Sequence, residues 1–234
     1  MELTAISDNH GYLPKDLPGG DVLCICGDIM PLDRQSRPSL GTEWFQGEFM
    51  DWINSLPYRK ALLIGGNHDF LLEDIGKAYG HDKVLDVLLP GYDKNESKLQ
   101  YLCDSSIIID GVLFYGTPWI SVLSRWAFYK PHRELVEAYG MIPPKCDVLL
   151  THMPPKGNRL GTVLQHGVYN TLADYGASEL DDALSVREIS YALCGHVHSG
   201  NHSPAPIGKT SHAVNVSLKD EDYKVAYRPF VFRI

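Results

Sequence analysis

The sequence predicts an α/β fold with mixed β-sheets, and three observations support this prediction. Short apolar runs of strand length recur along the chain, segments with helical spacing lie between some of them, and the final segment alternates as strands do. Strand–helix alternation followed by further strands is typical of layered α/β proteins. The 234 residues contain no repeat and no low-complexity linker, so we expect one domain over residues 1–234.

Seven apolar runs have the length of a β-strand, and most lack the polar alternation of a half-exposed strand. They are Leu3–Ile6, Val22–Cys26, Ala61–Ile64, Ser106–Ile109, Val112–Tyr115, Val148–Leu150 and Tyr191–Cys194. Cys24 and Cys26 lie on one face of the second run. Because a zinc site would need a second cysteine pair, we interpret them as small buried apolar residues.

Three segments show amphipathic helical spacing. The first is Thr42–Leu56, for which Thr42 is the expected N-cap residue. The second is Pro131–Tyr139, with proline in the first turn, and the third is Ser178–Val186, which begins with a serine and a glutamate. The segment Thr210–Ile234 is predicted to form strands.

Composition restricts the partners and the compartment. Lysine and arginine total 21 against 29 aspartate and glutamate residues, which gives a net charge of −8. Without a basic run, duplex nucleic acid and anionic membrane surfaces are not expected partners. No window approaches the ~20 apolar residues of a membrane-spanning helix. The five scattered cysteines and the absence of a signal-peptide pattern lead us to expect a cytoplasmic protein.

Five of the predicted strands are followed directly by side chains that can bind metal ions. Because ligands of α/β sheets bind beyond the carboxyl ends of the strands, these segments should converge on one crevice. The side chains are Asp8, His10, Asp28, Asn67, His68, His152, His196 and His198. Each segment alone also fits a capped turn or a solvated loop histidine, so it is the combination that predicts a site. Glycines at positions 27, 65, 66 and 195 would permit close backbone approach there.

The donor set contains carboxylate, amide and imidazole groups but no thiolate. Such a set suits divalent manganese, iron or zinc better than it suits a closed structural zinc site. We expect manganese, with iron, zinc or magnesium as alternatives. Metal ions would supply positive charge for a phosphate even in an acidic protein.

In their order along the chain, these motifs resemble the signature of calcineurin-like metallophosphoesterases. The matching motifs are Asp8-x-His10, Gly27-Asp28, Gly66-Asn67-His68-Asp69, His152 and Gly195-His196-x-His198. The resemblance implies a four-layer α/β/β/α sandwich of two mixed β-sheets flanked by helices, and a site for two divalent metal ions. It further implies the following roles: Asp8, His10 and His198 on one metal, Asn67, His152 and His196 on the other, Asp28 on both, His68 as the catalytic histidine, and Asp69 as the residue that orients it.

The resemblance also implies an activity, the hydrolysis of a phosphoester by in-line attack of a hydroxide that bridges the two metals. We expect a phosphodiesterase or phosphatase acting on a small nucleotide, cyclic nucleotides included, or on a similar small phosphoester. The run Gly116–Trp119 is similar to one in small phosphodiesterases of this family. The alternatives are a nuclease of the same family and a non-catalytic scaffold with this fold, although a scaffold would not need the full set of motif residues.

Residues outside the motifs carry weaker expectations. Basic or histidine side chains after His152 could contact substrate, although solvated positions fit them better: Lys156, Arg159 and His166. An aromatic group could face a nucleobase, although core packing fits it too: Trp119, Trp126, Phe128 and Tyr129. Four further histidines have no motif context and are interpreted as surface or structural residues: His81, His132, His202 and His212. The oligomeric state is left open.

Overall fold

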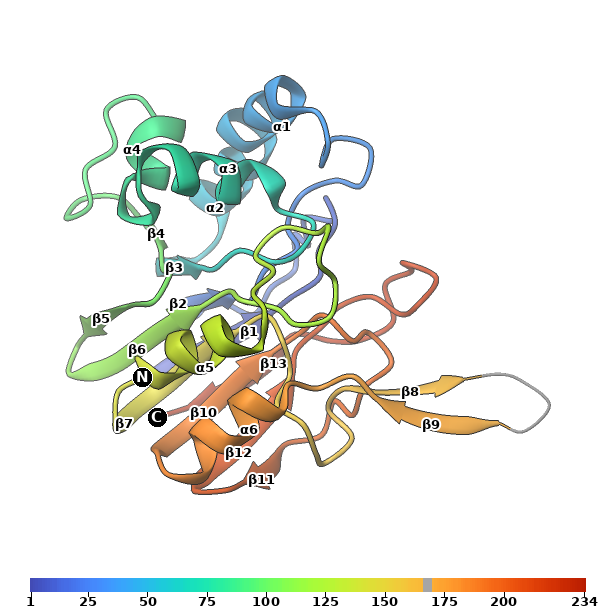
Figure 1. Cartoon of the computed structure of the whole chain (residues 1–234). Coiled ribbons are helices and arrows are strands. Elements are labelled where there is room, and N and C mark those ends of the chain that lie inside the picture. The colour runs from blue at the N-terminus through green and yellow to red at the C-terminus, as the bar shows by residue number, and fades with distance from the viewer. Residues whose placement is uncertain (166–169) are drawn as a thin grey trace.

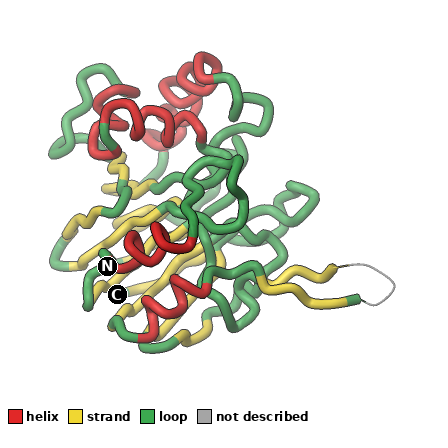
Figure 2. The backbone as a smooth tube through the Cα atoms, in the orientation of Figure 1, coloured by secondary structure: helices red, strands yellow, loops and turns green. Residues whose placement is uncertain are grey.

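Two large mixed β-sheets face each other in the computed structural model, which describes residues 1–165 and 170–234. Helices cover the outer side of each sheet, so the layers follow the order α/β/β/α (Figure 1). The backbone tube shows the same arrangement, with strands in the middle and helices outside (Figure 2). The predicted four-layer fold is confirmed.

The first sheet has the strand order β13-β1-β2-β3-β4. Its strands are β1 (Glu2–Ile6), β2 (Gly20–Ile25), β3 (Tyr58–Leu63), β4 (Leu99–Tyr101) and β13 (Phe230–Arg233). Strands β1 to β4 are parallel, and β13 runs antiparallel to β1 at the edge.

The second sheet has the order β11-β12-β10-β7-β6-β5. Its strands are β5 (Ser105–Ile109), β6 (Val112–Thr117), β7 (Lys145–Thr151), β10 (Glu188–Cys194), β11 (Ala205–Ile207) and β12 (Thr210–Asn215). The four inner strands are parallel, whereas β5 and β11 are antiparallel edges. A separate antiparallel ribbon, β8 (Thr162–Gln165) and β9 (Thr171–Asp174), projects from the body of the molecule (Figure 1).

The helices form two groups. Those over the first sheet are α1 (Pro38–Trp44), the π-helical turn η1 (Phe45–Phe49), α2 (Met50–Ser55), α3 (Phe70–Tyr79), the 3₁₀ turn η2 (His81–Lys83) and α4 (Val84–Leu88). Those over the second sheet are α5 (His132–Gly140) and α6 (Ser178–Ser185).

All three predicted helices are present, but two begin at a different residue. The helix predicted from Pro131 begins at His132, and Pro131 is its N-cap. The predicted Thr42–Leu56 helix begins at Pro38 and continues through the π-helical turn to Ser55, so Thr42 lies inside the helix and is not its N-cap. Pro38 explains the earlier start, because its fixed φ suits the first helical position and its missing N–H costs no helical hydrogen bond there. Helices α3 and α4 were not predicted.

All seven predicted strands are present, with two differences from expectation. Strand β5 is an edge strand with alternating exposure, and Ile108 is 68% exposed. The tail Thr210–Ile234 forms β12 and β13, which lie in different sheets. Strands β4 and β11 and the β8–β9 ribbon were not predicted.

The space between the two sheets is filled by small and branched apolar side chains. Cys24 and Cys26 are fully buried there together with residues such as Val22, Leu62 and Leu193. Both thiols are free, and burial raises their pKa. The interpretation of this cysteine pair as buried apolar residues is therefore confirmed.

The two sheets are joined by backbone hydrogen bonds at one end of the sandwich. The Ser7 N–H donates to Val216 O at 2.9 Å, and the Leu218 N–H donates to Ser7 O at 3.0 Å. Strand β1 ends beside this junction, and a segment that follows β12 forms its other side. No helix within the described ranges is long and apolar enough to cross a membrane.

Candidate metal centre

The structure brings all eight predicted site residues together at this junction. They follow β1, β2 and β3 of the first sheet and β7 and β10 of the second, so each sheet supplies part of one cluster. Seven of the eight are buried, and His196 is half-buried. Three sets of their donor atoms lie within 4.8 Å of one another: Asp8, His10 and His198; His10, Asp28 and His68; Asp8, Asp28 and His152.

The backbone at the cluster is held in an uncommon conformation. Asp8, His10, Asp28 and His196 have φ values of 56°, 43°, 55° and 68°, in the left-handed region that L-residues rarely adopt. Strain of this kind costs about 1–3 kcal/mol per residue and persists where the surroundings enforce it, typically at functional sites.

Glycine is required where these turns approach each other. A Cβ atom at Gly66 would lie 2.3 Å from Asp28 Oδ1, and one at Gly195 would lie 2.3 Å from Asp8 Oδ2. The expected close backbone approach is therefore confirmed, and any larger residue would displace the carboxylates.

Asp8 and His198 form one side of the cluster. His198 Nε2 lies 3.2 Å from Asp8 Oδ1, and Asp8 Oδ2 accepts a 2.7 Å hydrogen bond from the Ser217 hydroxyl. The other ring nitrogen of His198, Nδ1, donates to Asp220 O at 2.8 Å. His10 Nε2 lies 3.4 Å from His198 Nε2.

Asn67, His152 and His196 form the other side. Asn67 Oδ1 lies 3.0 Å from His152 Nε2 and 2.6 Å from His196 Nδ1. His152 Nδ1 donates to Cys26 O at 2.8 Å, which directs Nε2 into the cluster.

Asp28 lies between these two sides. Its Oδ2 atom is 3.4 Å from His152 Nε2, 3.8 Å from His10 Nε2 and 3.9 Å from His68 Nε2. Its Oδ1 atom accepts a 2.7 Å hydrogen bond from the His68 N–H. One carboxylate therefore faces imidazoles from both sides of the cluster.

His68 is oriented by a residue that the sequence did not indicate. Its Nδ1 contacts Gln35 Oε1, and its ring packs against Trp126 with centroids 4.5 Å apart. The expectation that Asp69 orients His68 is wrong. The Asp69 carboxylate instead accepts hydrogen bonds from backbone N–H groups, among them those of Asp28 and Gly66 at 2.8 Å, because its side chain turns back into the loops that precede it.

The carboxylates divide the imidazoles into two classes. Burial opposes protonation of His152 and His198, but Asp28 and Asp8 respectively raise their pKa to about 9. Burial lowers the pKa of His10 to about 4 and that of His196 to about 3. Burial alone would raise the pKa of Asp8, but the hydrogen bond and the electrostatic attraction between its carboxylate and His198 hold this pKa well below its ordinary value.

Asp28 shows the same effect, because His152 lowers its pKa against burial. Burial and the charge of Asp28 raise the pKa of Asp69 to about 7, although backbone N–H groups oppose this.

The chemistry of this donor set fits bound cations. Since Nδ1 of His152 and of His198 donates to a carbonyl, Nε2 of each neutral ring presents a lone pair towards Asn67 or Asp8 oxygens, which also carry lone pairs. Such contacts are favourable only when a proton or a metal ion lies between them. The mixture of oxygen and imidazole donors, without thiolate, is the kind that divalent transition metals accept.

A cavity of about 260 Å³ opens onto the cluster. Its walls are Asp28, Asn67, His68, Leu123, Trp126, His196, His198, Glu221 and Tyr223. No lysine or arginine of the described segments lines it, so positive charge for an anionic substrate would have to come from bound metal. Lys156 and Arg159 are exposed and do not line it, and His166 lies outside the described residues.

Of the four aromatic candidates, Trp126 lines this cavity. Trp119 and Phe128 are core residues, and Trp119 Nε1 donates to Asp104 at 2.7 Å. The four histidines without motif context make structural contacts: with Trp119 (His81), Glu179 (His132), Tyr227 (His202) and Tyr191 (His212).

Sequence reasoning missed three contributors to the site, Gln35, Ser217 and Tyr223. Tyr223 packs edge-on against His10 and His198, with ring centroids 4.9 and 5.3 Å away. Each lies in a loop whose position depends on the assembled sheets, so no local pattern identifies it.

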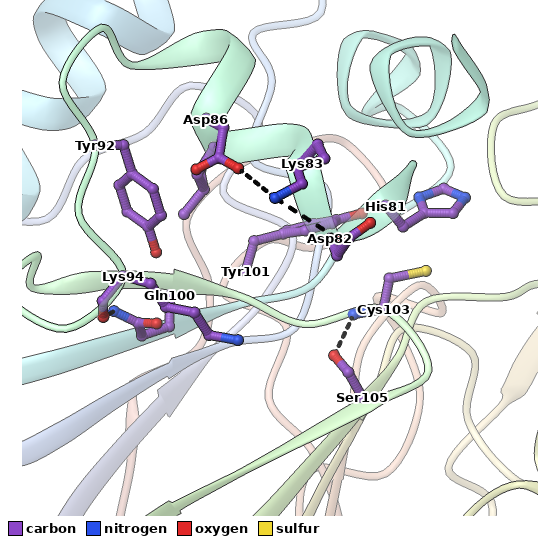
Figure 3. A pocket seen from close by; sticks show the side chains of 11 residues that line it. His81, Asp82, Lys83, Asp86, Tyr92, Lys94, Gln100, Tyr101, Cys103 and Ser105 are labelled. Atoms are coloured by element: carbon purple, nitrogen blue, oxygen red, sulfur yellow. Dashed lines mark hydrogen bonds and ion pairs between the residues drawn. The ribbon is translucent and has the colours of Figure 1, made fainter. Parts of the chain in front are cut away.

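A second cavity, of about 270 Å³, lies away from the cluster between η2–α4 and β4 (Figure 3). None of the eight site residues lines it. Two lysines and two aspartates line it, and Lys83 pairs with Asp82 and Asp86 at 4.0 and 3.2 Å, so the charges of these side chains largely neutralise each other.

Two facing mixed sheets with a cluster of aspartate, asparagine and histidine at their junction define a protein with a candidate centre for divalent metal ions. A family model described as calcineurin-like phosphoesterase matches residues 1–200, and the chain belongs to this family. It is therefore a phosphoester hydrolase, and its family generally uses a dinuclear divalent metal centre.

Named relatives agree with this assignment. The chain is 30% identical to the UPF0046 protein C25E10.12 of Caenorhabditis elegans, over 100% of this chain and 81% of that protein. It is also 30% identical to the human metallophosphoesterase domain-containing protein 1, over 97% of this chain and 68% of that protein.

Solved structures share the fold at low sequence identity. TT1561 of Thermus thermophilus superposes with a TM-score of 0.54 at 13% identity, over 92% of this chain and 88% of the other. The phosphopantetheinyl hydrolase of Mycobacterium tuberculosis gives a TM-score of 0.54 at 12% identity, over 94% and 90%.

Proposed function

We propose that this chain hydrolyses small phosphoesters, as a phosphodiesterase or phosphatase, with two divalent metal ions, manganese foremost. Asp8, His10 and His198 would hold one ion, and Asn67, His152 and His196 the other. Asp28 would touch both. The observation that carries the proposal is the convergence of these seven donor side chains, from five separate strand ends, on one buried cluster.

Bound metals would supply a nucleophile at neutral pH and positive charge for the phosphate. The protein groups do the rest. Asp28 is held by the hydrogen bond that its Oδ1 accepts from the His68 N–H, and Asn67 Oδ1 lies 3.0 Å from His152 Nε2, so both could be ligands of one ion. With both ring nitrogens protonated, His68 donates Nδ1–H to Gln35 Oε1 and can give the Nε2 proton to the leaving oxygen, which is the role of a general acid. Burial lowers the pKa of His68, so this form requires the negative charge that develops beside it during the reaction.

Small phosphoesters are favoured over long polyanions by the charge of the protein. The net charge is −8, and no lysine or arginine of the described segments lines the cavity. Nucleic acids are held largely by several phosphate contacts to cationic side chains, which the described walls of the cavity do not provide. A small nucleotide is the substrate class that we propose first.

The test compares two variants under Mn²⁺, with bis-p-nitrophenyl phosphate and a nucleotide panel as substrates and metal content by elemental analysis. Asp28→Ala should lose metal and activity together. His68→Ala should retain both metals and lose most turnover of the nucleotides, whose leaving oxygen needs a proton, about 10²-fold or more, with a smaller loss for bis-p-nitrophenyl phosphate. His132→Ala, an exposed histidine on α5, is the matched control and should behave as wild type.

Three outcomes would contradict the proposal. No metal-dependent turnover of any substrate by the wild type would refute the function. Loss of metal from His68→Ala would make His68 a ligand, a role that its place in a donor set with His10 and Asp28 also allows. Salt-sensitive degradation of single-stranded DNA in preference to small esters would favour the nuclease alternative.

A further inference from the structure

An apolar hollow, separate from the cavity in Figure 3, continues from the cavity over the metal cluster. It has a volume of about 340 Å³ and is lined by Val122, Leu123, Val163, Tyr175, His196, Val197 and Glu221. Leu123, His196 and Glu221 also line the cavity over the cluster, so the two spaces adjoin. We call this apolar hollow the side groove. His68 lines the first cavity but not the side groove, so the groove extends away from the catalytic histidine on the His196 side.

The walls of the side groove come from two segments that project beyond the sheets. Val163 lies on β8, and Tyr175 directly follows β9, at the base of the ribbon that leaves the body in Figure 1. The Tyr175 N–H donates to Gly161 O at 2.8 Å, which fixes the position of this tyrosine, and its side chain is 41% exposed.

Val122 forms the opposite wall in a conformation that costs energy. Its φ is 59°, a genuine outlier for a β-branched residue, and its side chain is 70% exposed. A residue with a strained backbone and a mostly exposed apolar side chain gains little packing energy from the fold at that position. Strain of this kind concentrates at ligand sites.

Glu221, an exposed carboxylate, places negative charge at the entrance shared by the two spaces. Its Oε1 atom accepts hydrogen bonds from the Ser199 N–H at 2.9 Å and the Ser199 hydroxyl at 2.7 Å, so the carboxylate is held in place. A phosphomonoester carries about −1.5 to −2 charges at pH 7, whereas a phosphodiester carries one. The fixed carboxylate therefore penalises the monoester more strongly.

We propose that the side groove holds an apolar or aromatic group esterified to the substrate phosphate through the oxygen that does not leave. The preferred substrates are then phosphodiesters with one such group, rather than phosphomonoesters. This inference rests on the proposed function. In the reaction, water adds its oxygen to phosphorus and releases one proton to solvent, from which His68 is later reprotonated, and the bond to the leaving oxygen breaks. That oxygen takes a proton from His68, and the phosphomonoester with its apolar group is released.

The test uses three esters with the same leaving group, so that only the other substituent changes: phenyl p-nitrophenyl phosphate, methyl p-nitrophenyl phosphate and p-nitrophenyl phosphate, each with Mn²⁺. We expect kcat/KM for the phenyl ester to exceed that for the methyl ester about tenfold, the factor that partial burial of one ring supplies. The monoester should be the poorest substrate.

Three variants identify the groove. Val122→Asn replaces an apolar wall by a polar residue that tolerates the left-handed backbone, so the fold should be preserved. This variant and Tyr175→Ala should reduce the phenyl-to-methyl ratio to about threefold or less. Glu221→Gln should raise turnover of the monoester several-fold relative to the methyl diester. Val136→Ser, at a 50% exposed position on α5, is the control and should leave every ratio unchanged.

Binding separates this inference from the proposed function. Diphenyl phosphate should bind the manganese-loaded protein more tightly than dimethyl phosphate in calorimetry, and Val122→Asn should remove the difference. If that holds but no ester is hydrolysed, the groove is correct and the hydrolytic function is wrong. A wild-type phenyl-to-methyl ratio near one, or a ratio that neither Val122→Asn nor Tyr175→Ala changes, would overturn the groove.

Discussion

Asp69 offers a sharp test of how the second and third motifs are held together. Its carboxylate is fully buried and accepts backbone N–H bonds from Asp28 and Gly66 through Oδ2, and from Ile29 and Met30 through Oδ1, at 2.8–3.1 Å. Asp69→Ala would leave four buried donors without an acceptor. At about 1 kcal/mol for each net hydrogen bond, the free energy of unfolding should fall by about 4 kcal/mol.

Asp69→Asn refines the test, because asparagine keeps one acceptor oxygen of the same shape. Each oxygen of Asp69 accepts bonds from two backbone donors at 3.1 Å or less, so this variant should lose about half as much, about 2 kcal/mol. Both variants should also bind metal more weakly, since the Asp28 turn loses its anchor.

Urea denaturation of the metal-free protein measures these changes directly. Asp74→Ala, at an exposed position on the same helix α3, is the control and should change stability by less than about 0.5 kcal/mol. A loss below about 1 kcal/mol for Asp69→Ala would refute the reasoning, because the backbone donors would then have found other partners.

Three further predictions concern the cluster. Without metal, His152 and His198 carry protons at pH 7 because their pKa is about 9, so manganese binding should release about two protons and metal affinity should rise with pH up to about 9. Calorimetry in buffers of different ionisation enthalpy measures the number of protons released, and a value of zero would contradict the prediction. Gln35→Ala should slow alkyl phosphodiesters, which need a well-oriented His68 proton, about tenfold more than p-nitrophenyl esters; equal effects on both would argue against general acid catalysis. Gly66→Ala should weaken metal binding and lower the free energy of unfolding by about 1–3 kcal/mol, because its Cβ meets Asp28. Gly140→Ala, which has open space around it, should change neither quantity when both variants are compared by chemical denaturation and metal analysis.

The sequence was sufficient for the strands and the motif residues because both are local signals. A buried strand is a continuous apolar run, and a ligand that follows it needs only the next few positions. The run Val22–Cys26 followed by Gly27-Asp28 illustrates both. The prediction that the motif residues from five strand ends converge on one site, by contrast, came from the general behaviour of sheet edges and from the family resemblance.

The errors arose where spatial neighbours are distant in sequence. Asp69 adjoins His68 in the chain, yet its carboxylate reaches the loop at Asp28, Ile29 and Met30, which precede it by 41, 40 and 39 residues. Gln35 contacts His68 from an irregular loop that has no periodic pattern. Strands β12 and β13 both belong to the tail predicted as strands but pair in different sheets, because strand order is decided by tertiary packing.

The junction of the two sheets has a consequence for the lifetime of the folded chain. The ring nitrogens of His10 and His198 that face each other are 188 residues apart in sequence, so the cluster exists only after both sheets have assembled. Contacts of such long sequence separation tend to form late in folding, and interactions absent from the transition state act on the unfolding rate rather than on the folding rate. Bound metal should therefore leave the folding rate almost unchanged and lower the unfolding rate, so that it lengthens the lifetime of the folded chain.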